Sequence, residues 1–97
     1  MHELEAIRAE IDRVDAQLAE AFLHRMELAR EVGRYKREAG RPVYDPQREA
    51  ALLQDRAARY GGGQEAMEEQ IRRFFRYLMD QSRALQERQE KGNEADE

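Results

Sequence analysis

Residues 31–49 read EVGRYKREAGRPVYDPQRE, and this stretch predicts where one helix ends and the next begins. Gly40 and Pro42 close the first helix, because glycine suits the residue after a helix end and proline cannot continue a helix. Asp45 is a suitable N-cap for the next helix, and Pro46 fits its first position. The stretch therefore predicts a short connection that brings charged residues of two helices close together.

Outward from this connection, the apolar residues predict three helices. They recur at alternating three- and four-residue spacing, which places them on one face of a helix. Three glycines at 61–63 separate the second helix from the third, and no segment alternates in the way that a half-buried strand does. We therefore expect an all-α chain with one long, one short and one medium helix, over residues 4–36, 45–58 and 64–89.

The length of the first predicted helix indicates a dimer. Residues 4–36 would span about 50 Å as a helix, whereas a compact domain of this size has a radius of gyration of about 13 Å. Part of the apolar face would therefore extend beyond the core of a monomer. We expect an intertwined antiparallel helical homodimer, with residues 1–90 as the folded domain and 91–97 as a disordered polar tail. The alternative is an extended monomeric helix hairpin.

The composition argues against several classes of protein. The 97 residues include no cysteine, so a disulfide framework or a cysteine metal site is excluded. His2 and His24 have no acidic or histidine partners at metal-binding spacing. The net charge of −4 argues against nucleic acid, and no apolar run approaches the ~20 residues of a membrane span. We expect a cytoplasmic protein without a metal or a cofactor, and without nucleic-acid or membrane partners.

Two cations interrupt the apolar face of the first predicted helix. Arg25 and Lys36 are eleven residues apart, so they lie on nearly the same face, about 16 Å apart along the axis. The third helix similarly ends its inward face with Ser82 and Gln86. Taken singly, each of these residues could reach solvent at its own position. Together with Arg48, they predict a positively charged pocket between three helices, suited to a small dianion.

Arg8 lies too far along the first helix to serve the same pocket within one chain. It precedes Arg25 by about 25 Å. In an antiparallel dimer, however, Arg8 of the second chain could complete the pocket of the first. The alternative is a surface salt bridge from Arg8 to Glu5 or Asp12.

Four motifs in order carry a resemblance to a known family. The sequence resembles the all-helical class of chorismate mutase, intertwined dimers that convert chorismate to prephenate in phenylalanine and tyrosine biosynthesis. The resemblance covers about residues 4–87. It rests on IRAEID (7–12), HRMELAREVGRYK (24–36), RPVYDPQRE (41–49) and DQSRALQ (80–86). The departures from the family are the glycine run at 61–63 and the residues beyond Gln89.

The resemblance implies residues that bind the two carboxylates of chorismate. Arg25 and the second chain's Arg8 would hold them, with Lys36 and Ser82 assisting. Arg48 would add positive charge to the pocket.

The resemblance also implies how the rest of the substrate is held. Glu49 would accept a hydrogen bond from the substrate hydroxyl, helped by the backbone N–H of Asp45. Lys36 and Gln86 would be the catalytic residues, donating to the ether oxygen of the bond that breaks. The reaction is a pericyclic [3,3] rearrangement, which needs no nucleophile, metal or cofactor.

Two other functions remain open from the sequence. Within the same fold, an isochorismate pyruvate-lyase would use a similar cationic pocket, although the grouping of Asp45, Arg48 and Glu49 favours the mutase. From another class, the chain could be a helical dimer or regulatory module without catalytic activity. Packing alone would not require the polar residues on the inward faces, which favours an enzyme.

Overall fold

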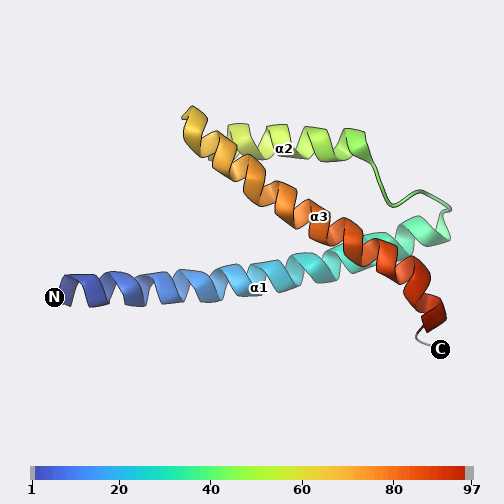
Figure 1. The fold of residues 1–97 in the computed structure, drawn as a ribbon, viewed down its shortest axis with the longest axis horizontal. Coiled ribbons are helices and arrows are strands. Elements are labelled where there is room, and N and C mark those ends of the chain that lie inside the picture. The colour runs from blue at the N-terminus through green and yellow to red at the C-terminus, as the bar shows by residue number, and fades with distance from the viewer. Residues whose placement is uncertain (1, 96–97) are drawn as a thin grey trace.

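The computed structural model describes the backbone of residues 2–95 and the side chains of residues 3–90. It contains three helices, α1 (His2–Glu38), α2 (Pro46–Tyr60) and α3 (Glu65–Ala95), and this part of the chain forms no strand (Figure 1). The prediction of an all-α chain with three helices is therefore confirmed. None of these helices has both the length and the apolar character needed to cross a membrane.

The helix ends follow from local sequence. The Asp45 side chain caps α2 by accepting a hydrogen bond from the Arg48 N–H at 3.1 Å, and Pro46 is the first helical residue. Gly40, after α1, has a φ of 69°, a left-handed conformation that glycine adopts without steric cost.

The third helix is longer than predicted. It continues to Ala95 instead of ending near Gln89, because residues 90–95 include good helix formers and a single glycine costs a helix only about 1 kcal/mol. Of the expected disordered tail, residues 96–97 lie outside the described residues.

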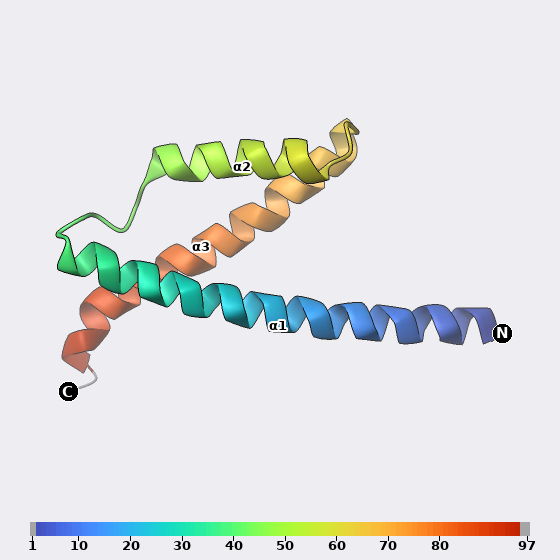
Figure 2. The same ribbon diagram turned by 180° about the vertical axis from the view of Figure 1, so that it is seen from behind.

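Helix α3 holds the chain together, because both other helices pack against it. Figures 1 and 2 show α3 crossing the C-terminal half of α1, while the N-terminal half of α1 extends away from the other helices. Gly33 lies at this crossing and is buried. A β-carbon at Gly33 would come within 3.0 Å of Gln86 Cγ and would also overlap Gln89 Oε1, so glycine allows the two helices to approach closely.

The chain is thin and encloses little core. Its extents are 55 × 33 × 14 Å, and the shortest is little more than the ~10–12 Å diameter of one helix. The radius of gyration is 17.1 Å, against about 13 Å for a compact domain of this length. The buried apolar side chains are few and include no aromatic ring: Ala29, Leu52, Ala57, Leu78, Met79 and Leu85. The fold therefore leaves most of its apolar helix faces exposed.

Candidate active site

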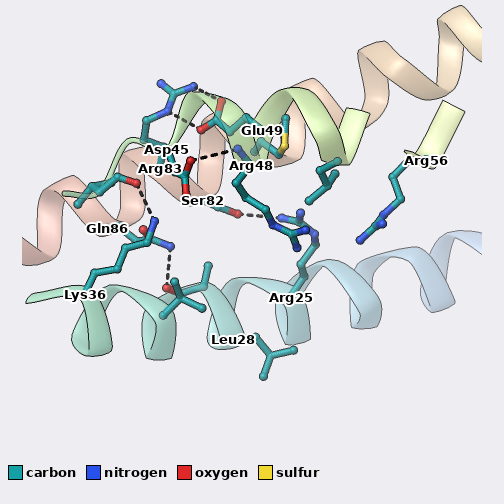
Figure 3. A pocket seen from close by; sticks show the side chains of 15 residues that line it. Arg25, Leu28, Lys36, Asp45, Arg48, Glu49, Arg56, Ser82, Arg83 and Gln86 are labelled. Atoms are coloured by element: carbon teal, nitrogen blue, oxygen red, sulfur yellow. Dashed lines mark hydrogen bonds and ion pairs between the residues drawn. The ribbon is translucent and has the colours of Figure 1, made fainter. Parts of the chain in front are cut away.

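A pocket of about 330 Å³ opens where the C-terminal half of α1, the start of α2 and the C-terminal half of α3 meet (Figure 3). Its volume is that of a site for a small molecule. The side chains that line it include both apolar and charged or polar groups. They are Arg25, Leu28, Ala29, Val32, Lys36, Val43, Asp45, Arg48, Glu49, Leu52, Arg56, Met79, Ser82, Arg83 and Gln86.

Three guanidinium groups gather at one end of the pocket. Figure 3 shows Arg25, Arg48 and Arg56 pointing toward one another from α1 and α2. Arg25 donates to Ser82 Oγ at 2.9 Å, and that hydroxyl donates to the carbonyl of Leu78 at 2.9 Å. Burial lowers the pKa of Arg25, and the charges of Arg56 and Arg48 lower it further. This end of the pocket therefore holds like charges that an anionic ligand would relieve.

The opposite end carries two positioned donors, Lys36 and Gln86 (Figure 3). Lys36 Nζ donates to the carbonyl of Val43 at 2.8 Å, and Gln86 Nε2 donates to the carbonyl of Ala29 at 3.0 Å. Gln86 is only 6% exposed. Because an ammonium has three N–H donors and an amide two, each side chain keeps donors for a ligand.

Glu49 forms the acidic side of the pocket and is held by two arginines of α3. Arg83 donates to it from Nε at 3.0 Å and from Nη2 at 3.2 Å, and Arg76 Nη1 adds a third contact at 3.1 Å. Hydrogen bonding by Arg83 lowers the pKa of Glu49, and this outweighs the opposing effect of burial. Glu49 is therefore an ionised acceptor at neutral pH.

Comparison with known proteins agrees with this geometry. The family described as chorismate mutase type II matches residues 7–87. The chain belongs to the chorismate mutase type II family. A solved structure described as chorismate mutase (form II) from Thermus thermophilus is 36% identical, with a TM-score of 0.81. The match covers 90% of this chain and 97% of that one.

Relatives of this chorismate mutase family member include longer proteins. The T-protein of Haemophilus influenzae is 40% identical over 79 residues, which is 78% of this chain. The chain spans only 21% of the length of that T-protein. The 4-amino-4-deoxychorismate mutase of Streptomyces venezuelae is 41% identical over 59 residues, covering 61% of this chain and 56% of that protein.

The structure brings together seven of the eight site residues that the sequence predicts. They line the single pocket described above: Arg25, Lys36, Asp45, Arg48, Glu49, Ser82 and Gln86. The Asp45 carboxylate is used as the cap of α2.

Arg8 is the exception. It lies exposed on the N-terminal half of α1, seventeen residues before Arg25 and about 25 Å away along the helix. It does not reach the pocket within one chain, as the sequence predicts.

Arg56 and Arg83 line the pocket but are not among the residues predicted from the sequence. Arg56 follows Arg48 and Leu52 at four-residue spacing, so the periodicity of α2 could have placed it on the pocket face. Arg83 directly follows Ser82, off the apolar stripe, and only its contacts with α2 reveal its place. Although Arg83 lies within the motif at 80–86, the family resemblance implies no role for it.

The pocket has no grouping typical of a metal centre. Across the described residues, no group of three or more histidine or acidic side chains could hold a metal ion.

Proposed function

We propose that this chain is a chorismate mutase, which converts chorismate to prephenate by a [3,3] rearrangement. The observation that carries the proposal is the polarity of the pocket, with guanidinium groups at one end and the donors of Lys36 and Gln86 at the other. Chorismate is a dianion. Its two carboxylates suit the guanidinium end of the pocket, and its ether oxygen suits the end with the Lys36 and Gln86 donors.

Binding at the arginine end would hold the substrate in its reactive conformation. Arg25, Arg48 and Ser82 come from three different helices, so a ligand that contacts all of them loses much of its freedom to rotate. Positioning of this kind supplies a large part of the barrier reduction in a unimolecular rearrangement.

The donors at the other end would stabilise the charge that forms during the reaction. As the C–O bond breaks, negative charge develops on the ether oxygen. Lys36 and Gln86 are already fixed by the carbonyls of Val43 and Ala29, so their remaining N–H groups need little reorganisation. Glu49 would accept from the substrate hydroxyl.

We further propose that two chains form an antiparallel homodimer and that Arg8 of the second chain completes the pocket. The support is the exposed apolar face of α1, where five side chains in a row are 45–57% exposed: Leu4, Ile7, Ile11, Val14 and Leu18. Monomeric proteins rarely leave such a continuous apolar face in water. Sedimentation equilibrium should give twice the mass of one chain, and a monomer at micromolar concentration would contradict this.

The direct test is to follow the loss of chorismate with purified protein, without added metal. We expect prephenate as the product. Salicylate and pyruvate formed from isochorismate, with chorismate left unchanged, would identify a lyase instead. Tight binding of chorismate without turnover would favour a module without catalytic activity.

A second candidate substrate is 4-amino-4-deoxychorismate, because the Streptomyces venezuelae relative is named 4-amino-4-deoxychorismate mutase. It carries an amino group in place of the hydroxyl. The Glu49 carboxylate could accept a hydrogen bond from either group. The cations around Glu49 favour the neutral hydroxyl, because a protonated amine would add a further positive charge beside them.

A further inference from the structure

A two-point ionic contact at the pocket joins two helices. Arg83 of α3 donates hydrogen bonds to both carboxylate oxygens of Glu49 of α2, at 3.0 and 3.2 Å. Both side chains are partly shielded from solvent, with 27% of Arg83 and 13% of Glu49 exposed. A two-point contact fixes the plane of the carboxylate as well as its position.

Arg83 is itself held by two other groups. Its Nη2 donates to Asp80 at 2.9 Å, and its guanidinium lies over the Tyr44 ring, 4.9 Å from the centroid. Its position therefore does not depend on Glu49 alone.

The charges that face Glu49 are mostly positive. From α3 these are Arg83 and Arg76, with Asp80 behind them. Arg48 precedes Glu49 on α2, and Lys36 of α1 lines the same pocket. The two arginines already make three hydrogen bonds to a carboxylate that has about four acceptor sites, so room remains for one more donor.

We propose that Arg83 is a positioning and specificity residue, which neutralises and orients Glu49 so that the pocket selects a neutral hydroxyl over an ammonium group. The inference rests on the proposed function. With Arg83 in place, Glu49 offers a hydrogen-bond acceptor with little remaining negative charge. Without Arg83, Glu49 and Asp80 would leave excess negative charge, which attracts an ammonium.

The experiment compares two substrates with the same protein preparation. We would measure kcat/KM for chorismate and for 4-amino-4-deoxychorismate at about pH 6.5, where the amine is largely protonated. The ratio of the two values does not depend on the fraction of folded protein. The variants are Arg83→Gln and, as a matched control, Arg72→Gln, which removes an α3 arginine that pairs with Glu69 outside this pocket.

The wild type should prefer chorismate, and Arg83→Gln should move the ratio toward the amino substrate by about tenfold or more. Arg72→Gln should leave it unchanged. Should Arg83→Gln not fold, Glu49→Gln provides the opposite test, because loss of the carboxylate leaves the arginines unopposed and should disfavour the amine further.

If Arg83→Gln leaves the ratio of the two kcat/KM values unchanged, or if Glu49→Gln shifts it toward the amino substrate, the role of Arg83 is refuted. The proposed function would still stand. A wild type that converts neither substrate would overturn the proposed function, and this inference with it.

Discussion

The two halves of α1 share one helix but have different surroundings. In the N-terminal half, Ile7 and Ile11 are 57% and 51% exposed. Among the described residues, neither α2 nor α3 lies beside this half of α1 (Figure 1). In the C-terminal half, Ala29 and Gly33 are buried against α3, and Arg25 and Lys36 face the pocket. The polar residues thus occur where the chain packs on itself, and the uninterrupted apolar face occurs where it does not.

This difference shows that the same helical spacing serves two kinds of contact. In the C-terminal half, Arg25 is satisfied by Ser82 of α3, so a charge on the inward face has a partner. In the N-terminal half, the apolar face has no packing partner among the described residues of the chain. The proposed catalytic residues of α1 thus lie in one half, and the proposed dimer contact lies in the other.

Removal of Lys36 should have the largest effect. We expect Lys36→Ala to lower kcat by about 10²–10³ or more, because a positioned charge at the breaking bond is lost. The melting temperature should change little, since Lys36 makes one hydrogen bond, to the carbonyl of Val43. Arg34→Ala, on the exposed face of the same helix, is the control and should retain activity. Near-normal turnover in a folded Lys36→Ala protein would refute the assignment of Lys36.

Mixing two inactive variants tests whether Arg8, in the N-terminal half of α1, completes the pocket of a second chain. Arg8→Ala chains and Lys36→Ala chains should each be inactive alone and recover activity when their subunits exchange. In a mixed dimer one of the two pockets has both residues intact, so up to half of the sites should work. Arg13→Ala, an exposed residue in the same half of α1, should stay active by itself. Subunit exchange without recovery would mean that Arg8 does not act across the interface.

A change at Gln86 should make the activity depend on pH. A glutamate at this position donates only when protonated, and its reference pKa is about 4.3. Burial and the nearby carbonyl of Ala29 favour the protonated form, whereas Lys36 favours the ionised one. We expect Gln86→Glu to lose activity at neutral pH and to recover part of it toward about pH 5. Parallel rate–pH profiles of variant and wild type, from about pH 5 to 8, would remove Gln86 from its role as donor.

The smallest expected effect is on stability. Arg83 holds the pKa of Glu49 below its ordinary value, so this ion pair stabilises the fold above the ordinary carboxyl range and is lost as pH falls through the lowered pKa. Glu49→Gln should therefore unfold more easily than the wild type at neutral pH, by about 1 kcal/mol. Urea unfolding at equal protein concentration should show the difference shrinking as pH falls below about 4. A difference that stays constant with pH would argue against this ion pair as its source.

The sequence predicts most of this fold because its signals are local. Asp45 and Pro46 mark a helix start, and Gly40 marks a helix end, whatever the rest of the chain does. The predicted end of α3 is wrong because residues 90–95 have no apolar periodicity, although they can still form a helix. Periodicity reports which residues a helix buries more reliably than where the helix stops.

The site is predictable only where its residues share a helix face or a family motif. Arg25, Lys36, Ser82 and Gln86 interrupt apolar stripes, so the interruption itself is a signal. Arg83 carries no such signal, because its importance lies in its contact with Glu49, 34 residues away. Ionic contacts between helices depend on how the helices cross, which spacing along one helix does not reveal.

The contacts at the crossing of α1 and α3 also bear on the order of folding. Arg25 with Ser82, and Gln86 with Ala29, are each 57 residues apart in sequence, whereas the helices themselves form through neighbouring residues. Loops of that length close late relative to helix formation, because their entropy must be lost before any contact forms. The pocket should therefore assemble only after most of the chain has become helical. Substitutions at these pairs should accelerate unfolding more than they slow folding.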